Sequence, residues 1–497
     1  MDHRSFWQKE KAPQFSSLQG DIEANTVIVG AGLCGLLCAY LLYQKGVTGI
    51  VIVDANEVCS GVTANTTAKI TSQHGLLYTK LMKGFDLEKA AEYAAANERA
   101  VRMYQEIIEK EKISCDFALC SAWVYTTLKE HIQDIKEEAE AAKRLDIAAS
   151  YKTETELPLA IKGAVEFHNQ AHFHPLKFAF SIVDILSKAG CKFYTNTKAL
   201  FAEERVVRTE KGDIYAKHII ACTHYPFIDK SSLLFAKIYQ ERSYVLAIKG
   251  VPAIHDMYID CVPGGLSFRP QKDEHNHDMI LFGAYDHKTG HENEKLHFDS
   301  LIKNAKKYYP DGEIAYMWSA QDCMTHDQIP YIGQYLRANK NIYIATGFNK
   351  WGMTSAMAAA DIISDLITKG KSDNYSIFST VRKDIGLQAK SFVKESVDIV
   401  GNFLTHLTKP QDELEDIERN EGRIVEIGSQ RMGVYKDMDG KLHAVKPVCT
   451  HMGCSIKWNK DENTWDCTCH GSRFDYKGHV IGGPAQKNLE YQEVRYI

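Results

Sequence analysis

Two short runs of cysteine and histidine near the C-terminal end constrain the fold of this chain most strongly. The runs are Cys449-Thr-His451 and Cys467-Thr-Cys-His470. Two thiolates and two imidazoles can hold a 2Fe–2S cluster in which one iron binds Cys449 and Cys467 and the other binds His451 and His470. The same ligand types can hold zinc in a tetrahedron, but the spacing is not that of the usual zinc motifs. The sequence therefore predicts a centre that moves single electrons.

The residues around these runs also favour a cluster over zinc. Cys454 follows the first run and Cys469 lies inside the second, so each ligand loop carries one spare cysteine. A disulfide between the two would clamp the loops together, which a zinc finger does not need. We therefore expect a Cys454–Cys469 disulfide beside the cluster.

The sequence from about Gly422 to the end resembles the Rieske family. The resemblance implies a small antiparallel β fold with the cluster at its tip, and a hydrogen bond from Ser472 to a bridging sulfide. High-potential members carry Tyr where this chain has Phe474, so we expect a potential in the upper half of the range of about −150 to +300 mV, below its ceiling. The matching segments are Cys449-Thr-His-Met-Gly-Cys454, Trp465-Asp-Cys-Thr-Cys-His-Gly-Ser472-Arg-Phe474-Asp and Gly482-Gly-Pro484-Ala485.

A second redox signature lies near the N-terminal end. A buried strand runs into Gly30-Ala-Gly32-Leu-Cys-Gly35 and an apolar helix, and a second buried strand ends at Asp54. This is the βαβ fingerprint of a dinucleotide site. Gly30 permits the tight turn, Gly32 lets the backbone approach a pyrophosphate, and Gly35 lets helix and strand pack. Asp54 is placed to take the ribose hydroxyls of either NAD or FAD.

Three further segments favour FAD. The hydroxyl-rich stretch 60–69 suits a ribityl chain and flavin ring, 212–223 is a hairpin leading into a buried strand, and 346–354 opens a long Ala-rich helix whose first N–H groups are free. With 318–322 and 327–333, residues 20 to 370 resemble the D-amino-acid oxidase and glycine oxidase type of FAD-dependent oxidoreductase. Cys323 does not sit where a covalent linkage is expected, so we expect noncovalent FAD. The candidate FAD-binding residues in these segments are Thr66, Thr67, Ala68, Thr223, Gly347, Gly352, Met353 and Thr354.

The length of 497 residues suits two or three domains. We expect a Rossmann-like α/β (α+β) FAD-binding domain with an antiparallel-sheet substrate domain, followed by a small all-β Rieske domain. The FAD-dependent oxidoreductase domain is expected at 20–375, with FAD-binding parts at about 20–75, 150–229 and 320–375 and substrate parts at about 76–149 and 230–319. A linker at 376–412, with an amphipathic helix over 391–407, leads to the Rieske domain at 413–497.

Composition limits the partners. A net charge of −5 makes no electrostatic case for nucleic acid. The apolar run 33–42 is too short for a transmembrane segment, and the first twenty residues show no signal core. Nine of the thirteen cysteines are scattered outside the cluster region, as in a reducing compartment. These features predict a cytoplasmic protein.

The sequence offers three candidate catalytic residues. Arg269 can bind a carboxylate or form an ordinary salt bridge, and Lys69 and His74 follow the flavin segment. A plain structural hydrogen bond is an equal alternative for His74. The histidines at 168, 172 and 174 can bind a metal but are more simply explained as hydrogen-bonded residues, because no acid or cysteine completes a ligand set.

A two-electron flavin fused to a one-electron cluster predicts a dehydrogenase. We expect oxidation of a small-molecule substrate, an amine or amino acid, with electrons passing from FAD to the cluster and on to an external acceptor protein. Two alternatives remain: an electron-delivery module that takes electrons from a donor and serves a partner enzyme, and a non-enzymatic redox sensor.

Overall fold

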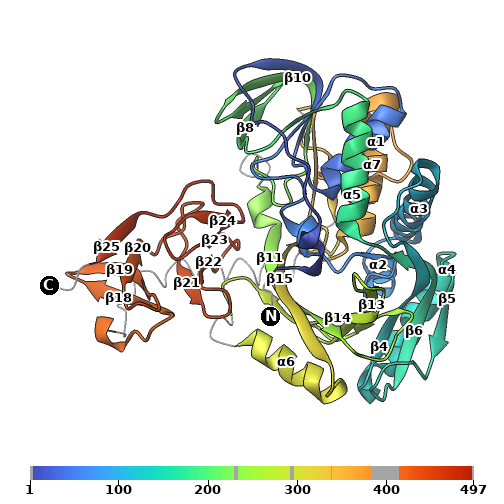
Figure 1. Ribbon diagram of the computed structural model, residues 1–497. Coiled ribbons are helices and arrows are strands. Elements are labelled where there is room, and N and C mark those ends of the chain that lie inside the picture. The colour runs from blue at the N-terminus through green and yellow to red at the C-terminus, as the bar shows by residue number, and fades with distance from the viewer. Residues whose placement is uncertain (1–3, 229–232, 292–295, 337–338, 383–412, 495–497) are drawn as a thin grey trace.

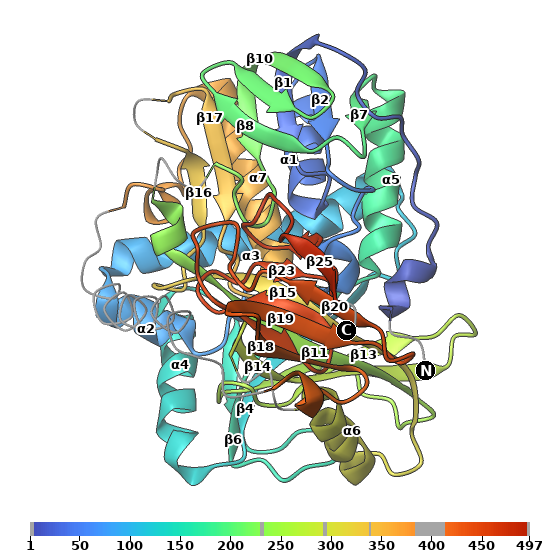
Figure 2. The ribbon, with the colours of Figure 1, turned by 90° about the vertical axis from the view of Figure 1, so that its left-hand side faces the viewer.

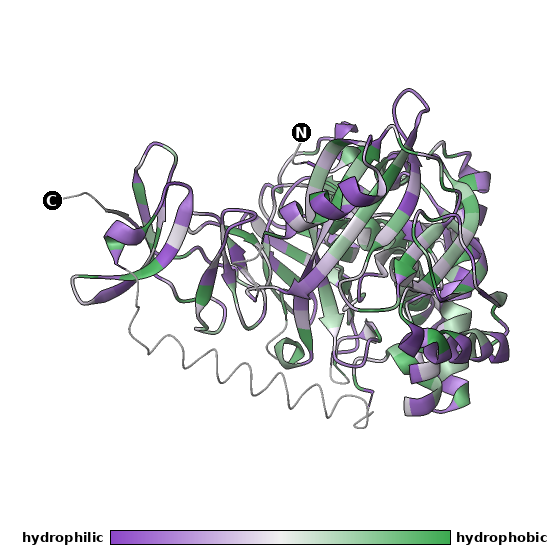
Figure 3. Ribbon diagram, turned by 90° about the horizontal axis from the view of Figure 1, so that it is seen from below, coloured by the Kyte–Doolittle hydropathy of each residue, from purple (hydrophilic) through white to green (hydrophobic). Residues whose placement is uncertain are grey.

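The computed structural model describes residues 4–228, 233–291, 296–336, 339–382 and 413–494. These residues form a large body built on two sheets and a smaller C-terminal lobe that stands to one side of it (Figures 1 and 3). The amphipathic helix expected over 391–407 lies outside the described residues. Among the described helices, none combines the length and the apolar character needed to cross a bilayer.

The first sheet of the body contains the predicted βαβ unit. Its central strands β1, β2, β10 and β17 run parallel and read as apolar runs, as expected for strands covered on both faces. Ile28 and Ile52 point into the core cluster that includes α1, α5 and α7, whereas Val27 and Val51 point into a second cluster on the other face. In spatial order the strands are β16 (Tyr331–Gln334), β17 (Ile342–Thr346), β10 (Gly212–Ala221), β1 (Ile22–Val29), β2 (Ile50–Val53) and β7 (Lys192–Tyr194), with β9 (Val206–Thr209) and β8 (Ala199–Glu203) off β10.

The second sheet is mainly antiparallel and forms the other half of the body. The sequence of residues 86–146 is rich in Ala, Glu and Lys and predicts two polar helices, but strand β4 lies between the helices and pairs with β6 and β12 inside this sheet. In spatial order the strands are β15 (Glu313–Thr325), β11 (Ile238–Lys249), β14 (Asp278–Lys288), β13 (Ser267–Lys272), β12 (Met257–Asp260), β4 (Ala118–Thr126), β6 (Gly163–His172) and β3 (Lys69–Ile70), with β5 (Ala149–Lys152) off β6.

The helices cover these sheets. Helix α6 packs its apolar side against β11 and β14, and α4 packs against β5 and β6. The α-helices are α1 (Leu33–Gln44), α2 (Leu77–Gly84), α3 (Leu87–Glu111), α4 (Ile132–Arg144), α5 (Pro175–Lys188), α6 (His297–Tyr308) and α7 (Gly352–Lys369). Short 3₁₀ helices are η1 (Phe6–Lys9), η2 (Val62–Asn65), η3 (Lys129–His131), η4 (Leu234–Ala236), η5 (Ser376–Phe378) and η7 (Leu414–Asp416).

The C-terminal lobe consists of two four-stranded antiparallel sheets. This confirms the small all-β domain expected there. Trp465 is fully buried at its centre, against Trp458 at a ring distance of 4.9 Å. The strands are β18 (Glu421–Ile427), β19 (Gln430–Lys436), β20 (Leu442–Val445) and β25 (Tyr491–Val494) in one sheet, and β21 (Ile456–Asn459), β22 (Thr464–Cys467), β23 (Arg473–Phe474) and β24 (Val480–Gly482) in the other.

Candidate functional site

A cavity of about 730 Å³ lies between the two sheets of the body and the C-terminal lobe. Its wall includes the carboxyl ends of β1, β2 and β10, the start of α7, and residues of β11 and β15. Segment 480–486 of the C-terminal lobe completes the wall. One cavity therefore touches both predicted redox regions.

The nucleotide end of the cavity fits a dinucleotide. A Cβ atom on Gly35 would lie 2.0 Å from the Gly30 carbonyl oxygen, so glycine is needed where α1 meets the turn. A Cβ on Gly32 would meet only the Thr63 hydroxyl at 3.4 Å, so this position opens onto the cavity. Gly32 directly precedes α1, whose first N–H groups favour an anion. Asp54 also lines the cavity at the end of β2.

The predicted flavin segment is held from both sides. Thr66 and Thr67 line the cavity, whereas Ala68 is buried behind them. The indole N–H of Trp7 donates to the Thr66 carbonyl at 2.7 Å, and that of Trp318 donates to the Asn65 carbonyl at 3.0 Å. Two buried tryptophans thus fix the backbone that is expected to pass along the ring.

The start of α7 places two of four predicted residues at the cavity. Gly352 and Met353 line it, as does Thr223 at the end of β10. Gly347 and Thr354 lie outside the lining, and Thr354 donates to the Thr71 carbonyl at 3.0 Å. The side chain of Thr354 therefore ties α7 to the backbone just after the flavin segment.

A group of ionisable residues lies beside the start of α7, and no sequence motif indicated it. We call it the acidic wall, and it consists of Glu241, Asp286, Asp322 and Lys350. Lys350 forms ion pairs of 2.6 Å with both Glu241 and Asp286. Burial lowers the pKa of Lys350, but the two carboxylates outweigh this and raise it above its ordinary value. The three side chains come from strands and a loop far apart in sequence, which explains why no local pattern indicates them.

Asp322 and Lys69 are the remaining ionisable groups that we single out at this wall. Burial raises the pKa of Asp322 to about 6, partly offset by Lys350. Burial and the nearby Arg269 guanidinium lower the pKa of Lys69 to about 7, and Lys69 donates to the Ser267 hydroxyl. Both side chains can therefore change protonation near neutral pH. Asp322 belongs to the 318–322 segment already noted, but its sequence context does not reveal its burial.

Two predicted catalytic residues do not line the cavity. His74 Nδ1 lies 2.6 Å from the Tyr93 hydroxyl, and its ring stacks on Trp351 at 4.8 Å, so it supports a cavity residue from behind. Burial lowers the pKa of His74 to about 3. Arg269 is fully buried, donates to the Phe173 carbonyl at 2.7 Å and lies over the Trp7 ring. Its guanidinium is directed to the protein interior.

The histidine cluster has structural contacts. His172 Nδ1 lies 3.1 Å from Arg269 Nη2, and His174 caps α5 by accepting a hydrogen bond from the Lys177 N–H at 3.3 Å. Pro175 is the first residue of α5. Burial lowers the pKa of His172 to about 2 and that of His174 to about 3, which keeps both neutral.

The four predicted cluster ligands come together at the end of the lobe that faces the body. Cys449, Cys467 and His470 are buried, and the Cys449 and Cys467 side chains contact each other. The rings of His451 and His470 lie 5.0 Å apart, centre to centre. His451 contacts Tyr225, a cavity residue, at a ring distance of 6.2 Å. Two cysteine sulfurs and two imidazoles that lie this close together fit a mixed-ligand 2Fe–2S cluster.

The expected disulfide is present beside these residues. Cys454 and Cys469 form a disulfide with a Cα–Cα distance of 6.3 Å, which joins the two ligand loops. Ser472 is fully buried and contacts Cys449, and its hydroxyl accepts a hydrogen bond from the Ala485 N–H at 3.1 Å. Phe474 is fully buried beside them.

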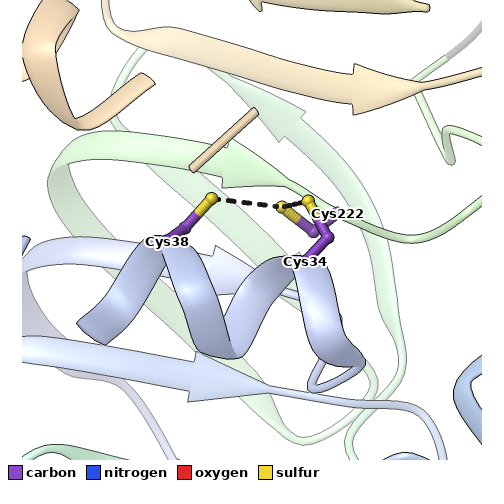
Figure 4. Close-up of side chains that lie close together, drawn as sticks. All are labelled: Cys34, Cys38 and Cys222. Carbon is purple, nitrogen blue, oxygen red and sulfur yellow. Dashed lines mark hydrogen bonds between the residues drawn. The ribbon is translucent and has the colours of Figure 1, made fainter. Parts of the chain in front are cut away.

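Three cysteines that the sequence leaves scattered also meet beneath the nucleotide turn. Cys222 Sγ lies 3.5 Å from Cys34 Sγ and 4.0 Å from Cys38 Sγ (Figure 4). Cys34 and Cys38 lie one turn apart on α1 and Cys222 follows β10, so helical spacing and strand register bring them together. All three are buried in the apolar core, where free cysteine packs as a small hydrophobic residue.

Comparison with known proteins identifies both regions. The family described as FAD dependent oxidoreductase matches residues 25–366, and the Rieske [2Fe-2S] domain matches residues 408–493. The chain belongs to the FAD dependent oxidoreductase family. It carries a C-terminal Rieske domain, and its cofactors are FAD and a Rieske 2Fe–2S cluster.

Relatives of this oxidoreductase cover one or both regions. YhfW of Bacillus subtilis (strain 168), named as a Rieske 2Fe-2S iron-sulfur protein, is 36% identical over 98% of this chain and 97% of its own. The gamma-glutamylputrescine oxidoreductase of Escherichia coli (strain K12) is 23% identical over 75% of this chain and 89% of its own. The L-proline dehydrogenase structure from P. horikoshii shares the fold, with a TM-score of 0.60 and 18% identity over 74% of this chain and 98% of its own.

Proposed function

We propose that this FAD-dependent oxidoreductase dehydrogenates a small amine or amino acid and passes the electrons through its Rieske cluster to an external acceptor protein. The observation that carries the proposal is that a single cavity is lined by the nucleotide turn, by residues of the acidic wall and by the C-terminal lobe. When bound, FAD supplies a two-electron acceptor that can release electrons singly, and the cluster accepts them one at a time.

The acidic wall supports an amine as the substrate. Asp286 is paired with Lys350, whereas no donor in the described part of the chain hydrogen-bonds the Asp322 carboxylate. An ionised Asp322 attracts a substrate ammonium group and, with a pKa of about 6, can take a proton from it. A neutral amine is the form that can give up hydride. The E. coli and P. horikoshii relatives are named for a gamma-glutamylated amine and for proline, which agrees with this substrate class.

Of the three predicted catalytic residues, we assign substrate contact to Lys69 alone. Lys69 lines the cavity, and its pKa of about 7 leaves part of the population neutral at physiological pH. Arg269 and His74 act indirectly in this proposal. Arg269 supports Trp7, and His74 supports Trp351.

The cysteines support a reducing compartment, and we propose the cytoplasm. Every cysteine outside the Rieske domain is unbridged, including the three that lie within reach of one another. In an oxidising compartment such a cluster would be open to disulfide formation. The Cys454–Cys469 bridge lies buried beside the cluster.

The proposal is tested by anaerobic mixing of the holoenzyme with separate amines, amino acids and NADH, followed by flavin absorbance. Bleaching by an amine or amino acid, and not by NADH, is the expected result. Bleaching by NADH alone would contradict it and favour an electron-delivery module. If no compound bleached the flavin, this result would contradict the proposal and favour a redox sensor.

A further inference from the structure

Strands β11 and β15 form a pair whose two faces meet different partners. Successive side chains of a strand point to opposite faces. Ser243 on β11 and its partner Ala320 on β15 line the cavity, as does Asp322. Arg242 and its partner Gln321 occupy the opposite face, toward the C-terminal lobe. In Figure 1 the sheet of β21–β24 is the part of the lobe next to this pair, and Figure 2 views the molecule from the side of the lobe.

The second ligand loop of the cluster is hydrogen-bonded to that face. Gln240 Nε2 donates to the His470 carbonyl at 3.2 Å, and Gln321 Nε2 donates to the Gly471 carbonyl at 2.9 Å. Gln321 also donates to Gln240 Oε1, so the two amides hold each other. One of these bonds therefore ends on the backbone of a cluster ligand.

The two surfaces approach so closely that each carries a glycine at the contact. A Cβ on Gly290 would lie 2.7 Å from the Thr468 Cα, and a Cβ on Gly471 would lie 2.7 Å from the Gln240 Cβ. Both glycines have positive φ values, of 81° and 73°. The body and the ligand loop are therefore shaped to fit each other.

A buried ion network closes the contact. Arg242 pairs with Glu462 of the lobe, their side chains being 3% and 15% exposed. Arg473 lies 3.2 Å from the same carboxylate, and the Ser319 hydroxyl hydrogen-bonds it. Burial raises the pKa of Glu462, but the two arginines outweigh this and lower it to about 2. Separating a buried carboxylate from its two cationic partners costs free energy, because the charges lose their pairing.

We propose that this face of the β11–β15 pair is a dock that holds the Rieske domain in one orientation, with Gln240 and Gln321 as positioning residues for His470. His470 then lies against the face of the strand pair that is opposite to the cavity residues Ser243 and Ala320. The role of the dock in electron transfer out of the flavin rests on the proposed function. Each transfer removes one electron from reduced flavin and converts one ferric ion of the cluster to ferrous, and no bond forms or breaks in the dock.

Two variants and one control test the dock in the full-length holoenzyme. Glu462→Gln removes the buried charge, and Gln321→Ala removes a neutral donor and so disturbs folding less. Glu490→Gln is the matched control, because Glu490 lies in the same lobe in a pair with Lys446 that is 64% exposed on both sides. Hydrogen–deuterium exchange reports docking at 286–291 and 467–472, and flash photoreduction of FAD reports flavin-to-cluster transfer.

We expect exchange in both segments to rise at least tenfold in Glu462→Gln and Gln321→Ala, with transfer slowed at least tenfold and the cluster spectrum retained. Glu490→Gln should match the wild type. Unchanged exchange in both variants would overturn the dock. Faster exchange with transfer at the wild-type rate would overturn the positioning role. Failure of every amine to reduce the flavin would refute the proposed function alone, because exchange and photoreduction need no substrate.

Discussion

The replacement Asp322→Asn should stabilise the protein while impairing its reaction. Asp322 faces the cavity from β15, and its carboxyl group has a pKa raised from 3.8 to about 6, chiefly by burial. The folded state therefore holds this proton more tightly than the unfolded chain does. The ionised form carries a folding penalty, which is absent well below pH 3.8, grows as the pH rises from about 3.8 to about 6, and is fully present at pH 8.

The size of this penalty follows from the two pKa values. At about 1.36 kcal/mol per pH unit, the difference corresponds to roughly 3 kcal/mol as an upper bound. Asn has nearly the same shape and no charge, so it removes the penalty at pH 8 and changes little at pH 4. The same replacement removes the group that we assign to bind and deprotonate the substrate, and such groups contribute about 10²- to 10⁴-fold to rates.

Two measurements check this prediction. Urea unfolding at pH 8 and pH 4 should show stabilisation only at pH 8, and Asp311→Asn, at an exposed position before β15, should show none. Anaerobic flavin reduction by an amine should fall at least about 100-fold in Asp322→Asn and lose the pH dependence near 6. Lower stability at pH 8, together with an unchanged amine reaction, would refute the reasoning.

Three further predictions concern the cofactors. Cys467→Ser or His470→Cys should abolish the Rieske electron paramagnetic resonance signal while flavin absorbance remains, because FAD is held by other residues; loss of flavin would contradict this. Gly32→Val should leave the fold intact but lower FAD affinity at least about tenfold in a titration, since its side chain points to the cavity and not to backbone; normal flavin content would show that the βαβ unit has been misread. Ser472→Ala should lower the cluster potential and Phe474→Tyr should raise it, each by tens of millivolts on a one-electron scale of about 59 mV per tenfold; a redox titration without change in either would defeat the role assigned to these side chains.

Local signals explain what the sequence could predict. The unit β1–α1–β2 can be recognised from the sequence because an apolar strand, closely spaced glycines and a terminal acid follow one another within a short stretch. The predicted cluster ligands can be picked out because the two members of each Cys/His pair lie within a few residues of each other. The pairing Cys454–Cys469 could be predicted because each ligand loop has one spare cysteine.

The features that sequence reasoning missed depend on contacts between distant segments. The pairing of Lys350 with Glu241 and Asp286 requires the register of the second sheet, and the dock of Gln321 on Gly471 requires the placement of a whole domain. Strand β4 was not predicted because it lies between two polar helices in the sequence. It pairs with β12 and β6, which are distant from it in the sequence. Arg269 has a suitable side chain for a carboxylate, but its burial under Trp7 depends on the N-terminal segment.

The central claim is that electrons taken up at the flavin leave through the Rieske cluster of the same chain. Stopped-flow mixing of the anaerobic holoenzyme with an amine that bleaches the flavin tests this most directly, with flavin and cluster absorbance followed together. We predict that flavin bleaching is followed by cluster reduction at a first-order rate that does not change when the protein is diluted tenfold. A cluster that stays oxidised while the flavin is reduced, or a rate that falls in proportion to dilution, would contradict the account.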